Sequence, residues 1–157
     1  MSAQPSPQPF APKTAADHWV LEQVRGHLDR DENMYAAAYA QTPLNGAGGI
    51  GAFVSAARAC GYHMVLTDRR LIMVVGRLGA FGPLMENKDV TEIRFSDIQD
   101  VSLGRTLFRK RFNGDLFLRA QGKTRVLQGQ RHDRYLSTTS AFYELLSSAE
   151  WRTAHAS

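Results

Sequence analysis

One segment of the chain has the residue pattern of a phosphate-binding loop. GAGGIG at 46–51 fits G-x-G-x-x-G, in which glycines let the backbone approach a pyrophosphate, and Asp68 follows at about the distance of a ribose-binding acid. Two features oppose this chemistry. The proline-containing QTPLN stands where a strand should enter the first glycine, and the chain reverses at Asp68-Arg69 without a crossover helix. A dinucleotide-binding oxidoreductase fragment is therefore kept only as an alternative.

A second segment, RTLFRKRF at 105–112, places basic side chains between phenylalanines and suits an anionic partner. From Arg105 to Arg134 the chain holds nine Lys or Arg against two Asp. The candidate anion- or lipid-binding residues are Arg105, Arg109, Lys110, Arg111, Lys123 and Arg125. Phenylalanines among arginines could also stack on bases, so binding of single-stranded nucleic acid is a further alternative. No RRM, KH, zinc-finger or helix-turn-helix signature accompanies them, so the sequence does not favour nucleic acid.

Catalytic patterns are absent from the sequence. The five histidines are dispersed and form no metal-ligand pair, and no G-x-S-x-G nucleophile motif occurs. Cys60 stands beside an apolar stretch, where a buried thiol is the simpler interpretation. His132-Asp133 is better explained as the start of a helix than as a catalytic pair. We therefore predict a protein that is not an enzyme, with no catalytic residue, metal or cofactor.

Length and composition indicate one globular domain. The 157 residues are 43% hydrophobic and 22% charged, and the single cysteine allows no internal disulfide. The start has no signal-peptide pattern, and no apolar stretch is long enough to span a membrane. We expect a cytoplasmic protein. Residues 1–13 and 153–157 are expected to be a disordered arm and a disordered tail.

The N-terminal half begins with a helix and continues with strands. Residues 14–30 predict an amphipathic helix, with Thr14 as its N-cap and apolar residues at helical spacing. MYAAAYA at 34–40 predicts a first strand. The clearest element is the hairpin 62–75, YHMVLTDRRLIMVV, which alternates on both sides of the Asp68-Arg69 turn. The glycine-rich GRLGAFGPLMENK at 76–88 predicts a loop.

The second half predicts further strands and a closing helix. VTEIRF at 90–95 resumes alternation, and the spacing near Gln99-Asp100 indicates a bulge. GDLFLRA and TRVLQGQ predict a last hairpin around Gln121-Gly122. The pattern then predicts a helix that begins at Asp133 and has Trp151 near its end. About seven strands and one helix predict a partly open antiparallel barrel that the helix closes.

The order of these elements resembles a known family. VLTDRRLIMVV, then FSDIQDVSL, then GDLFLRAQGKTRVLQG and a closing helix resemble bacterial pleckstrin-homology (PH)-like and GRAM-like domains. The resemblance covers about residues 28–150 and places the domain at 31–152. It implies a mainly β protein with a seven-strand barrel, and a non-catalytic scaffold that binds lipid headgroups or protein segments. In phosphoinositide-binding relatives the first hairpin's loop is basic, but residues 42–61 here contain only Arg58.

The remaining candidates lie around the glycine-rich loop. Ile50, Phe53, Val54 and Arg58 either belong to a connection packed on the barrel or contact a bilayer or a partner. Four basic residues near an anionic membrane contribute at most about 4 kcal/mol, so stable attachment needs a second signal, which this loop could supply. We expect an anionic phospholipid or a protein as partner, and a location at the inner face of the membrane when bound. The sequence assigns no oligomeric state.

Overall fold

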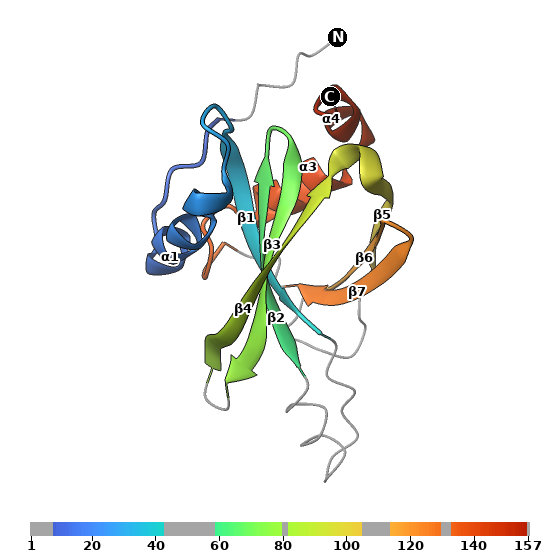
Figure 1. Cartoon of the computed structure of the whole chain (residues 1–157). Coiled ribbons are helices and arrows are strands. Elements are labelled where there is room, and N and C mark those ends of the chain that lie inside the picture. The colour runs from blue at the N-terminus through green and yellow to red at the C-terminus, as the bar shows by residue number, and fades with distance from the viewer. Residues whose placement is uncertain (1–7, 43–58, 80–81, 105–113, 130–132, 157) are drawn as a thin grey trace, which may run out of the picture.

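A computed structural model describes residues 8–42, 59–79, 82–104, 114–129 and 133–156. Within these ranges seven strands form one antiparallel sheet in the order β4-β3-β2-β1-β7-β6-β5 (Figure 1). The strands are β1 Met34–Gln41, β2 Cys60–Thr67, β3 Arg70–Gly79, β4 Gly82–Arg94, β5 Ile98–Gly104, β6 Gly114–Ala120 and β7 Lys123–Gly129. The helices are α1 Ala15–Val24, α3 Thr139–Ser147 and α4 Ala149–Ala154, with short 3₁₀ turns at Arg25–His27 (η1) and Phe95–Asp97 (η2).

This architecture confirms the predicted fold class. Seven antiparallel strands form an open sheet, a helix precedes β1, and the chain ends in a helical segment against the sheet, as expected for a PH-like fold. The parallel, Rossmann-like topology that the dinucleotide-binding alternative requires is not that of the described sheet. Every strand pairing in the described residues is antiparallel, and β2 turns straight into β3 without a crossover. The GAGGIG segment itself lies outside the described residues.

The prediction of a loop at 76–88 is wrong for most of that segment. β3 continues to Gly79 and β4 begins at Gly82, with Gly79 and Gly82 directly paired. Register shifts between Val75 and Arg77, and between Arg77 and Gly79, accommodate the glycines as irregularities in a long hairpin. Glycine-rich sequence here marks bulges within a ladder and not the end of the strand.

Two other turn predictions are confirmed. The β5–β6 ladder shifts register between Ile98 and Asp100, at the bulge predicted from the broken alternation. The β6–β7 hairpin turns at Gln121 and Gly122, which have φ of 53° and 70°. Positive φ at both central positions matches the right-handed twist of the flanking strands.

The inner face of the curved sheet holds the main core. Alternate residues of β1, β2, β3, β6 and β7 point inward and are closed off by α3 and α4. The fully buried members include Met64, Leu66, Leu71, Leu118 and Phe142. Each large apolar side chain removed from water here contributes about 1.5–3 kcal/mol, which is why the helices remain on the sheet.

A second core lies on the outer face of β1–β3, beneath α1. Val20 and Val24 of α1 are fully buried against Val65, Ile72 and Val74 of the sheet. Helical spacing of the apolar residues predicted this helix, although it ends at Val24 and continues only as η1. Phe10 of the N-terminal segment also packs against this core, and its N–H donates to the carbonyl of Met34 at 2.7 Å.

The C-terminal helix begins later than predicted and is divided in two. α3 starts at Thr139, six residues after Asp133, whose carboxylate instead accepts from the backbone N–H of Ser140 at 2.8 Å. The helix is interrupted at Ser148, whose hydroxyl caps α4 by accepting from the N–H of Trp151. Leu136 therefore joins the outer core under α1.

Candidate functional site

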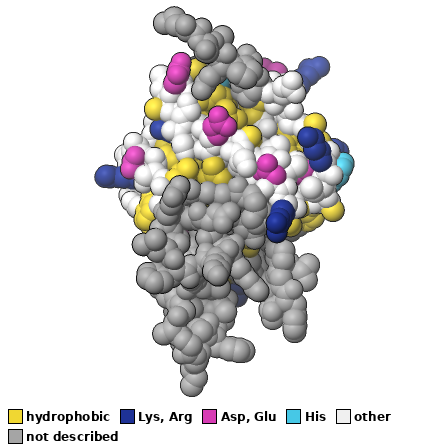
Figure 2. Space-filling view, turned by 180° about the vertical axis from the view of Figure 1, so that it is seen from behind, with side chains coloured by type: hydrophobic (Ala, Val, Ile, Leu, Met, Phe, Trp, Pro, Cys, Tyr) yellow, Lys and Arg dark blue, Asp and Glu magenta, His cyan; other side chains and the backbone are white. Residues whose placement is uncertain are grey.

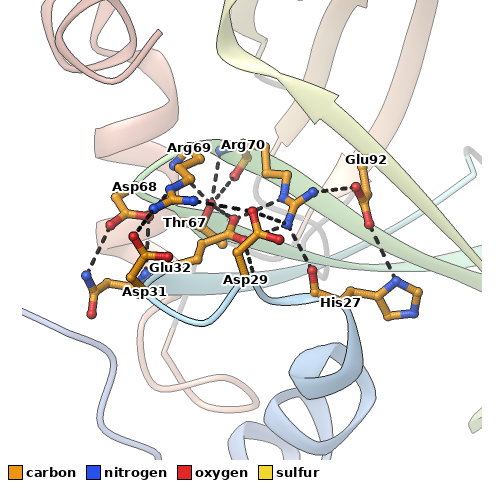
Figure 3. A network of polar contacts seen from close by, with 10 residues as sticks. His27, Asp29, Asp31, Glu32, Thr67, Asp68, Arg69, Arg70 and Glu92 are labelled. Carbon is orange, nitrogen blue, oxygen red and sulfur yellow. Dashed lines mark hydrogen bonds and ion pairs between the residues drawn. The ribbon is translucent and has the colours of Figure 1, made fainter. Parts of the chain in front are cut away.

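The most polar feature of the described residues is a set of contacts around the β2–β3 turn, here called the turn network (Figure 3). It joins the turn at 67–70 to the segment 27–33 before β1 and to Glu92 on β4. Its members are His27, Asp29, Asp31, Glu32, Asn33, Thr67, Asp68, Arg69, Arg70 and Glu92. It contains the Thr-Asp-Arg-Arg stretch on which the family resemblance depends most.

Thr67 closes the turn through its hydroxyl. Its Oγ1 accepts from the N–H groups of Arg69 at 3.1 Å and Arg70 at 3.0 Å, and it donates to Oε1 of Glu32 at 2.6 Å. A threonine suits this position because its hydroxyl satisfies backbone groups that the turn leaves unpaired.

Glu32 and Arg70 form the centre of the turn network. The Glu32 side chain is fully buried and accepts from Nε of Arg70 at 3.0 Å, from Nη2 of Arg70 at 2.6 Å and from the N–H of Asp29 at 3.0 Å. Burial alone would raise the pKa of Glu32, but the hydrogen bonds from Arg70, Asp29 and Thr67 outweigh it and hold the pKa below its ordinary value. The remaining nitrogen of Arg70, Nη1, donates to Glu92 at 2.6 Å.

Asp68 and Arg69 complete the turn network at the surface. Asp68 accepts from the backbone N–H and the side-chain amide of Asn33 at 3.2 and 3.1 Å. Arg69 donates to Asp29 at 3.3 Å and to Asp31 at 2.8 Å. The position considered for a ribose-binding acid thus joins the β2–β3 turn to the residue that precedes β1.

Charge and geometry make the turn network structural. Its five carboxylates face only two guanidinium groups, and both guanidinium groups donate to carboxylates of the network. A pocket of about 330 Å³ beside it is lined by Asp29, Arg69, Arg70, Arg94, Phe95, Ser96 and Ala156. An anionic ligand there would compete with existing carboxylates, so the pocket does not favour one.

The buried histidine, His63, is part of the core. His63 is 1% exposed, lies between the rings of Trp19 and Tyr39, and its Nε2 is hydrogen-bonded to Oη of Tyr135 at 3.0 Å. Burial lowers the pKa of His63 to about 4. Among the described residues no group of three or more His, Cys, Asp or Glu side chains could hold a metal ion.

Most of the sequence-predicted site residues lie outside the described ranges. These are Arg105, Arg109, Lys110, Arg111, Ile50, Phe53, Val54 and Arg58. The two others lie on β7. Lys123 is exposed at the strand's start, and Arg125 is half-buried opposite Leu118, a fully buried inner residue.

The strand ends that precede the two candidate segments, 43–58 and 105–113, lie on one row across the sheet. Gln41, where β1 ends, pairs with Gln128, which pairs with Asp115, which pairs with Gly104, where β5 ends. Three strand spacings separate Gln41 from Gly104, a distance of about 14 Å. The chain therefore enters segment 43–58 and segment 105–113 from neighbouring points, which strand counting in the sequence left open.

Exposed apolar side chains gather on the same half of the sheet. In the described ranges the exposed large hydrophobic residues are Leu103 on β5, Phe117 on β6 and Val126 on β7, at 36%, 37% and 38% exposure. Phe117 and Val126 are paired across the strands, and a Cβ on Gly104 would lie 3.0 Å from the Phe117 ring. α1 covers the outer face of β1–β3, whereas these side chains stay in contact with solvent. The sequence alone does not single them out, because an apolar residue in an alternating strand has the pattern of a core residue.

Comparisons with solved structures found similar folds. A pleckstrin homology domain from Shewanella amazonensis SB2B aligns over 90% of this chain and 91% of its own, with 13% identity and a TM-score of 0.49. The hSac2 domain from the human phosphoinositide phosphatase Sac2 aligns over 85% of this chain and 80% of its own, with 11% identity and a TM-score of 0.45. Likenesses at this level carry no information about ligand or partner.

The sequence itself matches no protein-family model and no curated protein. In the described part of the chain, no helix is both long and apolar enough to cross a membrane.

Proposed function

We propose that this protein is a non-catalytic binding module that attaches to anionic membrane surfaces through the β5–β7 half of its sheet and the two segments that join it. The basic segment 105–111 supplies the electrostatic attraction, and Ile50, Phe53 and Val54 supply the apolar contact. The observation that carries the proposal is the row from Gln41 to Gly104. The two segments follow the two ends of this row, which are about 14 Å apart.

Physical magnitudes require the two segments to act together. Four basic residues contribute about 1 kcal/mol each near an anionic bilayer, which gives only weak, salt-sensitive attachment. Apolar insertion beside them provides the second contribution that stable attachment needs. Phe117 and Val126, more than a third exposed, lie two positions from the same row and extend the apolar area.

Co-sedimentation with vesicles tests the proposal. Phosphatidylcholine vesicles containing phosphatidylserine should bind the protein at ~0.1 M salt and release most of it at ~1 M, because the Debye length falls from about 10 to about 3 Å. The triple variant R109S/K110S/R111S should lose binding. Its matched control, K13S/R25S/R30S, removes three exposed positive charges on the α1 side and should bind like the wild type.

Two outcomes would overturn the proposal. One is failure of the wild type to bind acidic vesicles at low salt. The other is equal weakening by the two triple variants, because general net charge would then explain the attraction. Pure phosphatidylcholine vesicles separate the contributions, since they should retain only weak binding that depends on Phe53.

A further inference from the structure

Two glutamines face each other on the outer side of the sheet, where β1 meets β7. Gln41, the last residue of β1, is paired with Gln128 of β7. Tyr39 belongs to the outer core, so Gln41, two residues later on the same strand, also points outward. Leu127 belongs to the inner core, so its neighbour Gln128 points outward as well. The two amide side chains are therefore neighbours on one face.

Both glutamines are buried although their side chains are polar. Gln41 is 7% exposed and Gln128 is 6% exposed. The side-chain oxygen of Gln128, Oε1, is screened from solvent and accepts no hydrogen bond within the described chain. A buried acceptor without a donor destabilises a fold, and the large majority of such atoms in native proteins have a partner. Gln128 thus holds an acceptor that the donor of a ligand would satisfy.

A second acceptor lies beside Gln128 on the same row. Asp115 of β6 is paired with Gln128 and also points outward, because the adjacent Leu116 is an inner core residue. The Cβ atoms of residues directly opposite on neighbouring strands lie about 5 Å apart. The amide oxygen and the carboxylate are both acceptors, and the carboxylate is negatively charged. This part of the row therefore suits hydrogen-bond donors and repels a phosphate.

The phosphate of a lipid must be held by other residues than these. Gly104, paired with Asp115, is the last described residue before the basic segment 105–111. By contrast, the described surface in Figure 2 has acidic side chains near its middle, with Lys and Arg dispersed toward its edges. Clustered positive charge in the sequence thus begins directly beside the two acceptors.

We propose that Gln128 and Asp115 select, among anionic phospholipids, those whose headgroup carries a hydrogen-bond donor beyond the phosphate, either a hydroxyl or an ammonium. This selection rests on the proposed function and adds to it a preference between headgroups. The headgroup donor pairs with Oε1 of Gln128, and an ammonium is attracted in addition by the carboxylate of Asp115.

Co-sedimentation with vesicles of equal charge tests the selection. Phosphatidylcholine vesicles contain the same fraction of phosphatidylglycerol, whose headgroup has hydroxyls, of phosphatidylserine, which has an ammonium, or of phosphatidylmethanol, which has no donor. The protein should bind the first two about fivefold more tightly than the third, the factor that corresponds to one hydrogen bond of ordinary net strength.

Three variants locate the preference. Q128L removes the acceptor without changing the net charge, so it should bind phosphatidylmethanol like the wild type and lose the preference for the other two lipids. Its matched control, Q99L, makes the same replacement at an exposed position of β5 and should keep the preference. D115N should lower the ratio of phosphatidylserine binding to phosphatidylglycerol binding, because it removes the charge that attracts the ammonium.

The side-chain amide signals of Gln128 in NMR spectra give a second readout. They should shift with nanodiscs that contain phosphatidylglycerol and stay unchanged with phosphatidylmethanol nanodiscs or with free glycerophosphate. A shift caused by glycerophosphate alone would assign the acceptors to a soluble ligand and contradict the lipid.

Two kinds of failure are distinguishable. Equal binding of all three lipids by the wild type would overturn the selection and leave membrane attachment intact, whereas binding to none of them would contradict the attachment itself. A preference that persists in Q128L would also overturn the selection. The same holds if Q128L loses binding to phosphatidylmethanol, because Gln128 would then support the fold and not the headgroup.

Discussion

The guanidinium of Arg70 holds the carboxylate of Glu32 with two hydrogen bonds, at 2.6 Å from Nη2 and 3.0 Å from Nε, although 38 residues separate them in the chain. The contact fixes the segment before β1 against the β2–β3 turn. Arg70 of the LTDRRL stretch therefore has a structural role. Its guanidinium forms ion pairs with Glu32 and Glu92 and is not presented to a ligand.

Replacing Arg70 by Leu should lower the free energy of unfolding by about 3 kcal/mol, because it leaves the buried Glu32 carboxylate without its cation. Urea denaturation measures the loss. Arg69→Ser removes only exposed ion pairs, which solvent screens, and should therefore cost much less than the loss of Arg70. Equal losses in the two variants would contradict the central position of Arg70.

Gly129 must remain without a side chain. A Cβ there would lie 1.9 Å from Oη and 2.9 Å from Cζ of Tyr143, so the Tyr143 ring on α3 would have to move. Gly129→Ala should therefore destabilise the protein by about 1–3 kcal/mol, as other overpacking substitutions do. Thermal unfolding measures the change. Gly26→Ala, where nothing lies within 4 Å, serves as the control and should leave stability unchanged or slightly raised.

Stability should fall on acidification between about pH 6.5 and 4 because of His63. Its pKa is about 4 in the fold and 6.5 when unfolded, so the unfolded chain takes up the proton first in this range. At about 1.4 kcal/mol per pKa unit, the loss approaches 3 kcal/mol near pH 4. Glu32 contributes a further loss of stability only below about pH 4.5, its unfolded pKa, because its pKa is lowered in the fold. Chemical denaturation as a function of pH measures the slope.

The variant H63F should flatten that slope above pH 4.5, whatever its own stability. The control H18Q changes an exposed histidine of α1 and should keep the slope of the wild type. A slope that persists in H63F would assign the acid sensitivity to other groups.

Asp17 should be needed to hold α1 on the sheet. Its buried carboxylate accepts from the N–H groups of Lys13 and Thr14 at 2.9 Å and of Ser137 at 3.0 Å, so it joins the start of α1 to the segment before α3. Asp17→Ala should cost about 1–3 kcal/mol because these donors lose their acceptor. Limited proteolysis should then cut near α1 before the sheet unfolds. Cleavage elsewhere first would contradict this role.

Local patterns predicted the fold well where one rule acts alone. Alternation identified the β2–β3 hairpin, its break located the bulge at Ile98–Asp100, and Gln121-Gly122 marked the last turn. They failed where context decides. Glycines at 76–82 interrupt a ladder that pairing with the neighbouring strand sustains, and Asp133 bonds to the N–H of Ser140 while α3 begins only at Thr139.

The candidate site was less accessible to sequence analysis than the fold. Clustered charge pointed to segment 105–111, but no pattern in the sequence reveals that Gln41 and Gly104 lie on one row, because that relation depends on three strand pairings.

We expect the membrane surface to lie at the β5–β7 half of the sheet and not at the arginines of the β2–β3 turn. The most direct test is an NMR titration of the labelled protein with nanodiscs containing phosphatidylserine. We expect selective broadening of the amides of Gln41, Gly104, Asp115 and Gln128, with Thr67–Arg70 unaffected. Broadening centred on Arg69 and Arg70, with the row from Gln41 to Gly104 unchanged, would contradict it.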